Sequence, residues 1–309
     1  MNLTAKSRVL TSFVMVAGLA ACATDGQPGA PTALCVAGDM PIAASLLHIF
    51  RGAPGGSGFG LIGPEQLAVS MNDFWIADRG RGELVRADRD GRRSTMVARM
   101  PGRVAGLHVD RLQSVYIALP AQRVVRQYST DARVEREFRD SDGGMVPVDV
   151  VADGTGKVFV ADGANARVVI FNRVGQVSGT VGERLSIPNP FVSVNALAQE
   201  AGRLLVLDAS ARKIHIVRED GSMEFRDFGD YVQHPVAVAA DPWRRIFVGD
   251  QDGRILVFDA RRANTITELQ GTPRVAMLGD LWIDETGVLH LADTVGAAVY
   301  SLLLPAPCP

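Results

Sequence analysis

Residues 147–176, PVDVVADGTGKVFVADGANARVVIFNRVGQ, decide the fold of this chain. Three short apolar runs, residues 148–152, 158–161 and 168–171, are separated by two segments rich in Asp, Gly and Asn. Runs of Val, Ile and Phe bounded by such turn residues predict β-strands joined by tight turns. A sheet of this size cannot bury both of its faces alone, so the stretch predicts neighbouring copies of itself.

The same pattern recurs along the chain, and it is clearest where the second strand of each unit ends. Five units end this strand in an aspartate, and one ends it in Leu119. The five marker aspartates are Asp78, Asp162, Asp208, Asp250 and Asp293. Successive spacings of 41, 43, 46, 42 and 43 residues indicate six repeats of one unit. An acid that recurs in this way indicates a structural role in the following turn rather than catalysis.

Each unit contains a small apolar first strand, a second strand that ends at the marker position, a third strand and a more polar fourth strand. Four antiparallel strands repeated around an axis describe the blades of a β-propeller. The last unit lacks a fourth strand, whereas residues 45–50, SLLHIF, form an unassigned strand before the first unit. Pairing the two would leave no open edge on that blade. We therefore predict an all-β, six-bladed β-propeller over residues 45–309, closed by an N-terminal strand in the last blade.

The central stretch resembles an NHL repeat. The residues that carry the resemblance are Pro147, Asp153, Gly156, Val160-Ala161-Asp162, Asn165 and Arg167-Val168-Val169-Ile170-Phe171. Residues 241–258 match less fully, and the unit around Leu119 lacks the marker acid. The resemblance covers about residues 45–304 and implies a propeller of NHL-like blades. It implies no function, because propellers serve as binding proteins, scaffolds and enzymes.

The first 21 residues are typical of an export signal peptide. Two basic residues precede an apolar run at residues 9–21, which is shorter than the about 20 residues of a membrane span. The run ends in Leu19-Ala20-Ala21-Cys22, which resembles the lipobox of bacterial lipoproteins. The resemblance implies cleavage before Cys22 and lipidation of its thiol. Ala23, rather than Asp, follows the Cys, and by resemblance to Gram-negative lipoproteins this favours an outer membrane lipoprotein that faces the periplasm. The alternative is an ordinary secreted protein with a chance Cys after its signal.

Residues 22–44 are rich in Gly, Pro, Ala and Thr and predict a flexible tether between the lipid and the propeller. Closure of the ring brings Cys35 and Cys308 toward the same side of one blade. An even pair in an exported protein predicts a disulfide, and two free thiols are the alternative. The net charge of −2 provides no basic face for nucleic acid. We expect membrane contact through the lipid anchor only.

Polar residues where the innermost strands begin form the one convergent ring that the sequence offers around the central channel. The ring consists of Glu65, Gln66, Arg103, Asp149, Asn195, His234 and Asp280. Glu65, Asn195 and a further Asp carry the oxygen donors that Ca²⁺ prefers, a set similar to that of the gluconolactonase-like propellers. The alternative is that each residue only caps its strand. The equivalent places of Asp149 and Asp280 in their units favour this alternative.

Histidines offer a second set of metal ligands, because the peptidyl-hydroxyglycine lyases, which are propellers of similar repeats, hold zinc through His residues of different blades. The histidines of this chain are His48, His108, His215, His234 and His290. Only His234 falls at the channel mouth, and one His does not make a zinc site. The sequence therefore leaves the metal unknown.

The 46-residue step before Asp208 departs from the period, and its excess residues fall in 182–191. Leu185, Ile187 and Phe191 are apolar in this loop, which also contains two prolines. Loops on rigid scaffolds often carry recognition, so we hypothesise a partner contact here. The alternative is a loop folded back on its own blade.

These observations favour a non-enzymatic module that requires no cofactor. It would be a lipid-anchored propeller that scaffolds or binds an envelope protein, peptide or glycan. The alternative is a hydrolase, lactonase or lyase that uses Ca²⁺ or zinc at the channel-mouth ring, like the gluconolactonase-like or hydroxyglycine-lyase-like propellers. Stoichiometric metal that is lost on substitution of Glu65, Asn195 and Asp280 would favour the enzyme.

Overall fold

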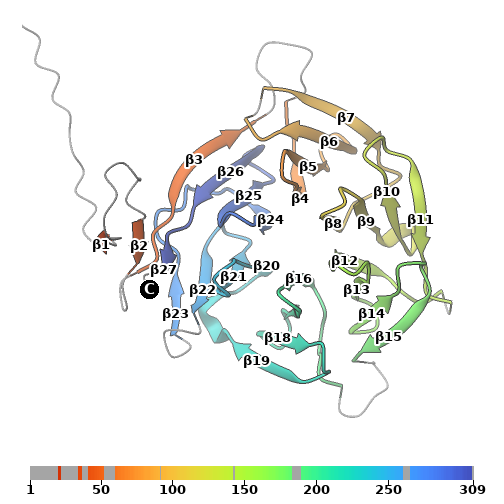
Figure 1. Ribbon diagram of the computed structural model, residues 1–309. Coiled ribbons are helices and arrows are strands. Elements are labelled where there is room, and N and C mark those ends of the chain that lie inside the picture. The colour runs from red at the N-terminus through yellow and green to blue at the C-terminus, as the bar shows by residue number, and fades with distance from the viewer. Residues whose placement is uncertain are drawn as a thin grey trace, which may run out of the picture.

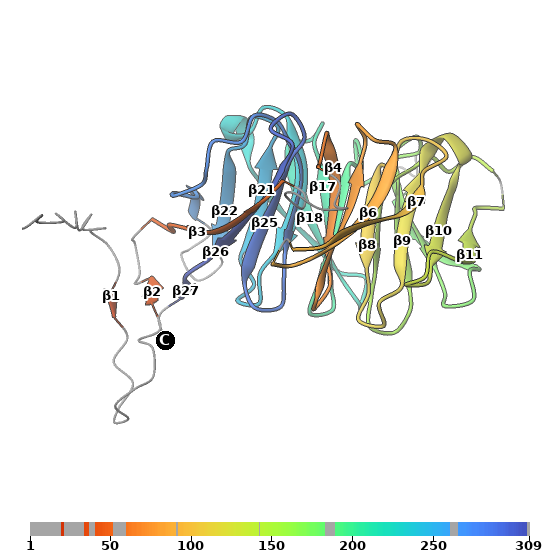
Figure 2. The ribbon, with the colours of Figure 1, turned by 90° about the horizontal axis from the view of Figure 1, so that it is seen from above.

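The computed structural model describes residues 20–21, 34–36, 41–51, 60–90, 92–141, 143–182, 189–259 and 265–307. Six four-stranded antiparallel sheets are arranged around a central axis (Figure 1), so the predicted all-β six-bladed propeller is confirmed. Seen from the side, the strands cross the thickness of a disc (Figure 2). Helical structure in the described residues is limited to two 3₁₀ turns, Pro120–Gln122 and Gly229–Tyr231.

The blades are numbered in chain order, and their strands run from the channel outward. Blade 1 contains β4 (Pro64–Val69), β5 (Asp73–Asp78), β6 (Glu83–Asp88) and β7 (Ser94–Arg99). Blade 2 contains β8 (Gly106–Val109), β9 (Val115–Leu119), β10 (Val124–Tyr128) and β11 (Val134–Phe138). Blade 3 contains β12 (Pro147–Ala152), β13 (Val158–Asp162), β14 (Arg167–Phe171) and β15 (Val177–Val181).

The second half of the ring follows the same order. Blade 4 contains β16 (Ala196–Glu200), β17 (Arg203–Asp208), β18 (Lys213–Arg218) and β19 (Met223–Asp227). Blade 5 contains β20 (Pro235–Ala240), β21 (Ile246–Asp250), β22 (Ile255–Asp259) and β23 (Thr265–Glu268). Blade 6 contains β24 (Leu278–Ile283), β25 (Val288–Asp293), β26 (Ala298–Leu303) and β3 (Ser45–Phe50).

Blade 6 takes its outermost strand from the N-terminal side of the chain, as predicted. β3 pairs antiparallel with β26, and His48 lies opposite Ser301. Just before β3 the backbone also pairs with the end of blade 5. The N–H of Ala44 donates to the carbonyl of Gln270 at 2.8 Å, and the N–H of Gln270 donates to the carbonyl of Ile42 at 2.9 Å. This segment therefore fastens two blades.

A seventh sheet, with three strands, lies beside blade 6 and contains β1 (Ala20–Ala21), β2 (Leu34–Val36) and β27 (Ala306–Pro307). In the parallel pair β2–β27, Cys35 lies opposite Ala306. Cys22 and Cys308 lie outside the described residues, so the lipidation and the disulfide stay predictions. Among the residues described, no helix is long and apolar enough to cross a membrane.

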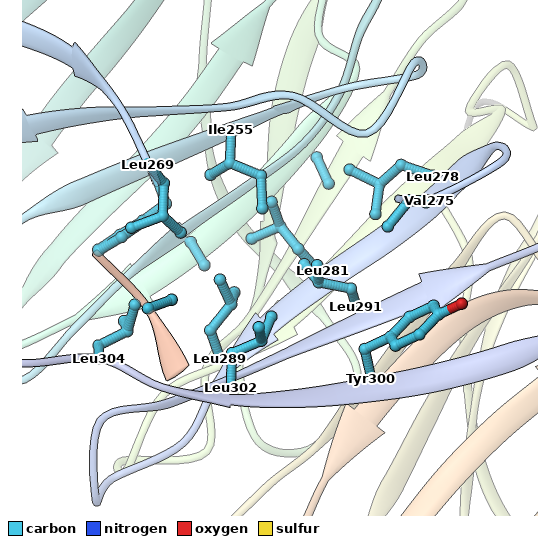
Figure 3. Close-up of a cluster of buried hydrophobic side chains, with 14 of the residues drawn as sticks. Ile255, Leu269, Val275, Leu278, Leu281, Leu289, Leu291, Tyr300, Leu302 and Leu304 are labelled. Carbon is cyan, nitrogen blue, oxygen red and sulfur yellow. The ribbon is translucent and has the colours of Figure 1, made fainter. Parts of the chain in front are cut away.

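The hydrophobic core is divided among the gaps between blades. Every residue of β9 and of β22 is buried, whereas the outermost strands β11 and β15 are largely exposed. Between blades 5 and 6, Ile255, Leu289 and Leu302 belong to one cluster of buried apolar side chains (Figure 3). Burial of apolar surface stabilises the fold by roughly 25 cal/mol per Å², so the apolar side chains packed between blades hold the blades together.

In the five blades that have one, the marker aspartate ties the blade to the linker that leads into it. Asp208 is fully buried, and its carboxylate accepts the N–H groups of Val192 at 2.7 Å, Ser193 at 3.0 Å and Ala211 at 2.9 Å. Asp78, Asp162, Asp250 and Asp293 also accept linker N–H groups. Burial opposes ionisation of Asp208, but His215 and these N–H groups lower its pKa to about 2. The acids serve the fold, as their repetition predicts.

Candidate binding site at the channel mouth

The mouth face is the face of the disc where the innermost strands begin, with the linkers between blades and the turns after the second strands. The seven predicted ring residues lie at two depths on this face. Gln66, Asp149 and Asp280 share one position in the strand register, just after a β-bulge. The other four, Glu65, Arg103, Asn195 and His234, lie in that bulge or in the linkers before the strands. The structure therefore does not bring the seven residues together at one position of the strands, because the bulge shifts the register in a way that sequence alignment of the units does not show.

Glu65 is the centre of the outer set. It is the extra residue of the bulge between Pro64 and Gln66, so its side chain leaves the regular alternation of β4. Glu65 is 8% exposed, and its Oε1 lies 2.9 Å from Arg103 Nε, 2.8 Å from Arg103 Nη2 and 3.4 Å from Arg79 Nη1. Each arginine side chain is 61% exposed. One buried carboxylate therefore holds two guanidinium groups at the surface.

These three residues line a hollow of about 220 Å³ on blade 1 and the linker into blade 2, here named the arginine hollow. Met100 and Val104 add apolar wall to it. Glu83, also in the lining, lies 2.9 Å from Arg81 Nε and 4.0 Å from Arg99 Nε. The two glutamates therefore contact four guanidinium groups. The lining itself holds two arginines, Arg79 and Arg103, and three carboxylates, Glu65, Asp78 and Glu83. The three carboxylates are buried, whereas the two guanidinium groups are exposed, so a ligand in the hollow would meet the cations first. Exposed cations in a concave site favour an anionic ligand.

The arrangement is specific to blade 1. At the bulge position of Glu65, blades 3, 5 and 6 have Val148, Val236 and Gly279. After the marker aspartate, where blade 1 has Arg79, they have Gly163, Gln251 and Thr294. Because the repeat does not require these charges, they are a property of the site and not of the fold. Sequence reasoning selected Glu65 and Arg103 but missed Arg79, whose signal is a basic residue where other blades have uncharged ones.

Asp149 and Asp280 fasten the innermost strands to one another. Asp149 Oδ2 accepts the N–H of Leu197 in blade 4 at 2.7 Å. Asp280 Oδ2 accepts the N–H of Leu67 in blade 1 at 2.9 Å. The second oxygen of each carboxylate accepts the N–H of the next residue in its own strand. The two equivalent acids therefore have equivalent structural bonds, which agrees with the structural alternative for this pair.

The surroundings of these two carboxyl groups favour their protonated forms. Burial among the innermost strands raises the pKa of Asp149 to about 7, although two backbone N–H groups favour its charged form. Burial also raises the pKa of Asp280 well above its usual value, and the charge of Asp149 raises it further. A carboxyl group that titrates near neutral pH is suited to general acid–base chemistry. The channel thus offers a second candidate site.

Two aromatic rings lie deeper in the propeller than these acids. The centroids of His108 in blade 2 and Trp282 in blade 6 are 5.3 Å apart, although blade 1 separates their blades in the ring. Burial lowers the pKa of His108 to about 4, so its imidazole is neutral at pH 7. Sequence reasoning placed His108 in a strand but found no partner for it. Only closure of the propeller brings the side chains of His108 and Trp282 together.

Asn195 and His234 belong to the outer set by position, but their hydrogen bonds go to other partners than Glu65. Asn195 Oδ1 accepts hydrogen bonds from Ser193 Oγ at 2.7 Å and from the N–H of Ala209 at 3.0 Å. His234 is exposed, and its backbone N–H donates to Asp250. The suggested calcium ligands Glu65 and Asn195 are thus engaged with different partners. Within the described ranges no group of three or more His, Cys, Asp or Glu residues is placed to hold a metal ion.

The long loop before blade 4 packs inward at its C-terminal end. Phe191 is 4% exposed and belongs to the cluster of apolar side chains between blades 3 and 4. Its ring meets His215 edge-on at 4.9 Å between centroids. Leu185 and Ile187 lie outside the described residues. The proposed partner contact through Phe191 is therefore wrong: its apolar side chain is more stable in the core than at the surface.

A serine, a histidine and an aspartate also meet in blade 6. His290 Nδ1 lies 2.9 Å from Ser301 Oγ, and His290 Nε2 lies 3.3 Å from Asp284 Oδ2. All three residues are buried, and Arg89 of blade 1 binds both Asp284 and His290. A serine in the middle of β26 under this cover cannot meet a substrate. The cluster instead joins blade 6 to blade 1 at the closure of the ring.

No protein-family model and no curated protein sequence matches this chain. Solved structures do. A streptogramin B lyase has 13% identity and a TM-score of 0.60, with 85% of this chain and 97% of that chain covered. A catalytically inactive virginiamycin B lyase from Staphylococcus aureus, solved with quinupristin, has 12% identity and a TM-score of 0.62, with 85% and 94% covered. A gluconolactonase from Xanthomonas campestris has 15% identity and a TM-score of 0.64, with 86% and 97% covered. At these identities the similarity shows a shared propeller fold.

Proposed function

We propose that this propeller is a lipid-anchored binding module of the cell envelope. Its arginine hollow binds a ligand with an acidic group, such as the carboxylate of a peptide or of an acidic glycan. The observation that carries the proposal is the pair Arg79 and Arg103 on buried Glu65, found in one blade only. Glu65 orients the two guanidinium groups, which line the hollow and are 61% exposed. Guanidinium donors bind carboxylates through paired, charge-assisted hydrogen bonds.

The other acidic side chains of the mouth face are less suited to bind a ligand than the arginine hollow is. The marker aspartates and both oxygens of Asp149 and Asp280 already accept backbone N–H groups. The side chains of Arg79 and Arg103, by contrast, are exposed and are therefore accessible to a ligand. The proposal includes the lipid anchor at Cys22 and the periplasmic location, both of which are predictions from the sequence.

The test compares Arg79→Ala/Arg103→Ala with a matched control, Arg126→Ala/Arg139→Ala. Arg126 and Arg139 also share one glutamate, Glu137, but on the outer strand β11 and outside the arginine hollow. Titration calorimetry with a tetraglutamate peptide and with oligogalacturonate measures affinity. We expect the first double variant to lower affinity by about tenfold or more, since charge-assisted hydrogen bonds contribute about 1.5–3 kcal/mol each. The control should bind like the native protein. Equal binding by all three proteins would refute the proposal.

Catalysis in the channel is the second candidate. The pKa of about 7 for Asp149 supports it, and the similarity to a lyase and a lactonase agrees better with an enzyme than with a scaffold. In this case Asp149 or Asp280 would act as general acid or base. Turnover of gluconolactone or quinupristin by metal-supplemented protein, lost in Asp149→Asn, would establish it. Metal analysis of the same preparation tells whether calcium or zinc is bound.

A further inference from the structure

The outermost strand of blade 6 differs from the other outermost strands in its exposed side chains. On β3, Leu46 is 48% exposed, Leu47 is 54% exposed and Ile49 is 40% exposed. Leu303 on the adjacent β26 is 42% exposed. Other outermost strands expose mostly polar or charged residues, as in VEREF of β11. We name these four aliphatic side chains the rim patch.

A β-bulge creates the patch. The register between β26 and β3 pairs Ser301 with His48 and Leu302 with Leu46, so Leu47 is the extra residue. A regular strand alternates its faces and would bury every second side chain. The bulge instead leaves both successive leucines exposed. The aliphatic surface is therefore a built feature of this strand and not an isolated exposed residue.

The chain leads from this rim toward the predicted lipid. β2 already lies beside blade 6, where it pairs with β27. If the connection from Cys22 to Leu34 has the flexibility predicted from its composition, its average span is roughly 20 Å. A bilayer that holds the lipid therefore lies near blade 6. Blade 3, on the opposite side of the disc, lies farther from the predicted lipid than blade 6 does.

The charges beside the rim patch suit a lipid surface. Residues 41–51 contain no Asp or Glu. Arg51, which follows β3, is exposed, and its Nη1 donates to the carbonyl of Gly296 at 2.7 Å. This bond holds a positive charge at the C-terminal end of β3, two residues beyond Ile49. Aliphatic side chains with a basic neighbour are the combination that binds the interface of a bilayer with anionic lipids.

We propose that the rim patch is a membrane-docking surface that rests on an anionic bilayer beside the lipidated Cys22. The proposal depends on the predicted anchor and is independent of the ligand of the arginine hollow. It replaces the expectation that the membrane is contacted through the lipid only. Because β3 lies on the edge of the disc, docking would set the propeller on edge and leave the mouth face open (Figure 2).

The test uses the full lipidated protein in vesicles of phosphatidylethanolamine and phosphatidylglycerol with brominated acyl chains. Leu47→Trp places a reporter in the rim patch, and Val177→Trp is its control, since Val177 is 42% exposed on the outermost strand of blade 3. Bromine quenches tryptophan that reaches the acyl region. We expect added loss of emission in Leu47→Trp, relative to native protein, and none in Val177→Trp. Equal emission loss in both variants would overturn the proposal.

A second variant protects the test against misfolding and against the rival occupant. Leu46→Ser/Leu47→Ser/Ile49→Ser changes exposed side chains, and its melting temperature reports folding. Both proteins should stay anchored to the vesicles. When vesicles are added, we expect the amides of β3 to become protected from hydrogen exchange in native protein but not in this variant. If a Leu47→Cys variant forms dimers in detergent that are cross-linked through position 47, the patch joins two copies and the proposal fails.

Discussion

Blades 1 and 3 share one backbone design but differ in what their mouth-face residues do. In blade 3, Val148 and Gly163 occupy the bulge and the first residue after the marker aspartate. In blade 1 the same places hold Glu65 and Arg79. Both blades use their marker aspartate to bind the linker N–H groups. The comparison teaches that the repeated residues build the blade, whereas the departures from the repeat carry the candidate site.

The largest expected effect tests the shared part of the comparison. Asp162→Ala in blade 3 removes a buried carboxylate that accepts the N–H of Val146 at 3.0 Å and pairs with Arg167 at 2.9 Å. We expect a loss of about 3–5 kcal/mol in the free energy of unfolding, because the partners stay buried without it. Asp78→Ala in blade 1 should cost a similar amount. Urea denaturation measures both, and a neutral result in either blade would contradict the shared structural role.

The second effect concerns the closing blade. If Cys35 and Cys308 form the predicted disulfide, reduction should lower the free energy of unfolding by about 2–5 kcal/mol. The pairing of Cys35 opposite Ala306 supports this expectation. Mass spectrometry of the unreduced protein detects the bond directly. A Cys35→Ser variant serves as control, because its stability should not respond to reductant.

The third effect separates the channel acids from the mouth-face charges by their response to pH. The pKa of Asp149 is raised to about 7 by burial, so the folded protein holds a proton that the unfolded chain releases near pH 4. The stability contributed by this proton is present below pH 4 and is lost as the pH rises toward 7. We expect Asp149→Asn to flatten the dependence of unfolding free energy on pH over this window. An unchanged slope would show that the carboxyl titrates normally.

The smallest effect on stability sharpens the difference between the blades. Glu65→Gln should change the free energy of unfolding by less than about 1 kcal/mol, because its arginine partners are largely exposed. Ligand affinity should nevertheless fall, since the guanidinium groups lose the charge that orients them. Glu137→Gln on blade 2, which also loses two arginine contacts, is the matched control. A fall in affinity in both variants would contradict a role specific to Glu65, because the loss of a carboxylate by itself makes the protein more positive and favours an acidic ligand.

Much of the fold was predictable because its signals are local. The marker aspartates, the turns that follow them and the apolar runs repeat at a period near 43 residues, and this period predicts six blades. The closing strand followed from a missing partner in the last unit. The bulge at Glu65 was not predictable, since an extra residue changes register without changing the pattern of apolar runs. Phe191 was misplaced because a loop residue and a core residue look alike until packing is known.

The sequence alone determined the blades, because strands and turns depend on neighbours a few residues apart. Only the tertiary structure decided which polar groups meet. Glu65 and Arg103 are 38 positions apart, Asp149 reaches Leu197 across 48, and Asp280 reaches Leu67 across 213. Such contacts depend on how neighbouring blades pack around the axis, which no local pattern encodes. The same holds for the rim patch, whose exposure is set by the register of β3 on β26.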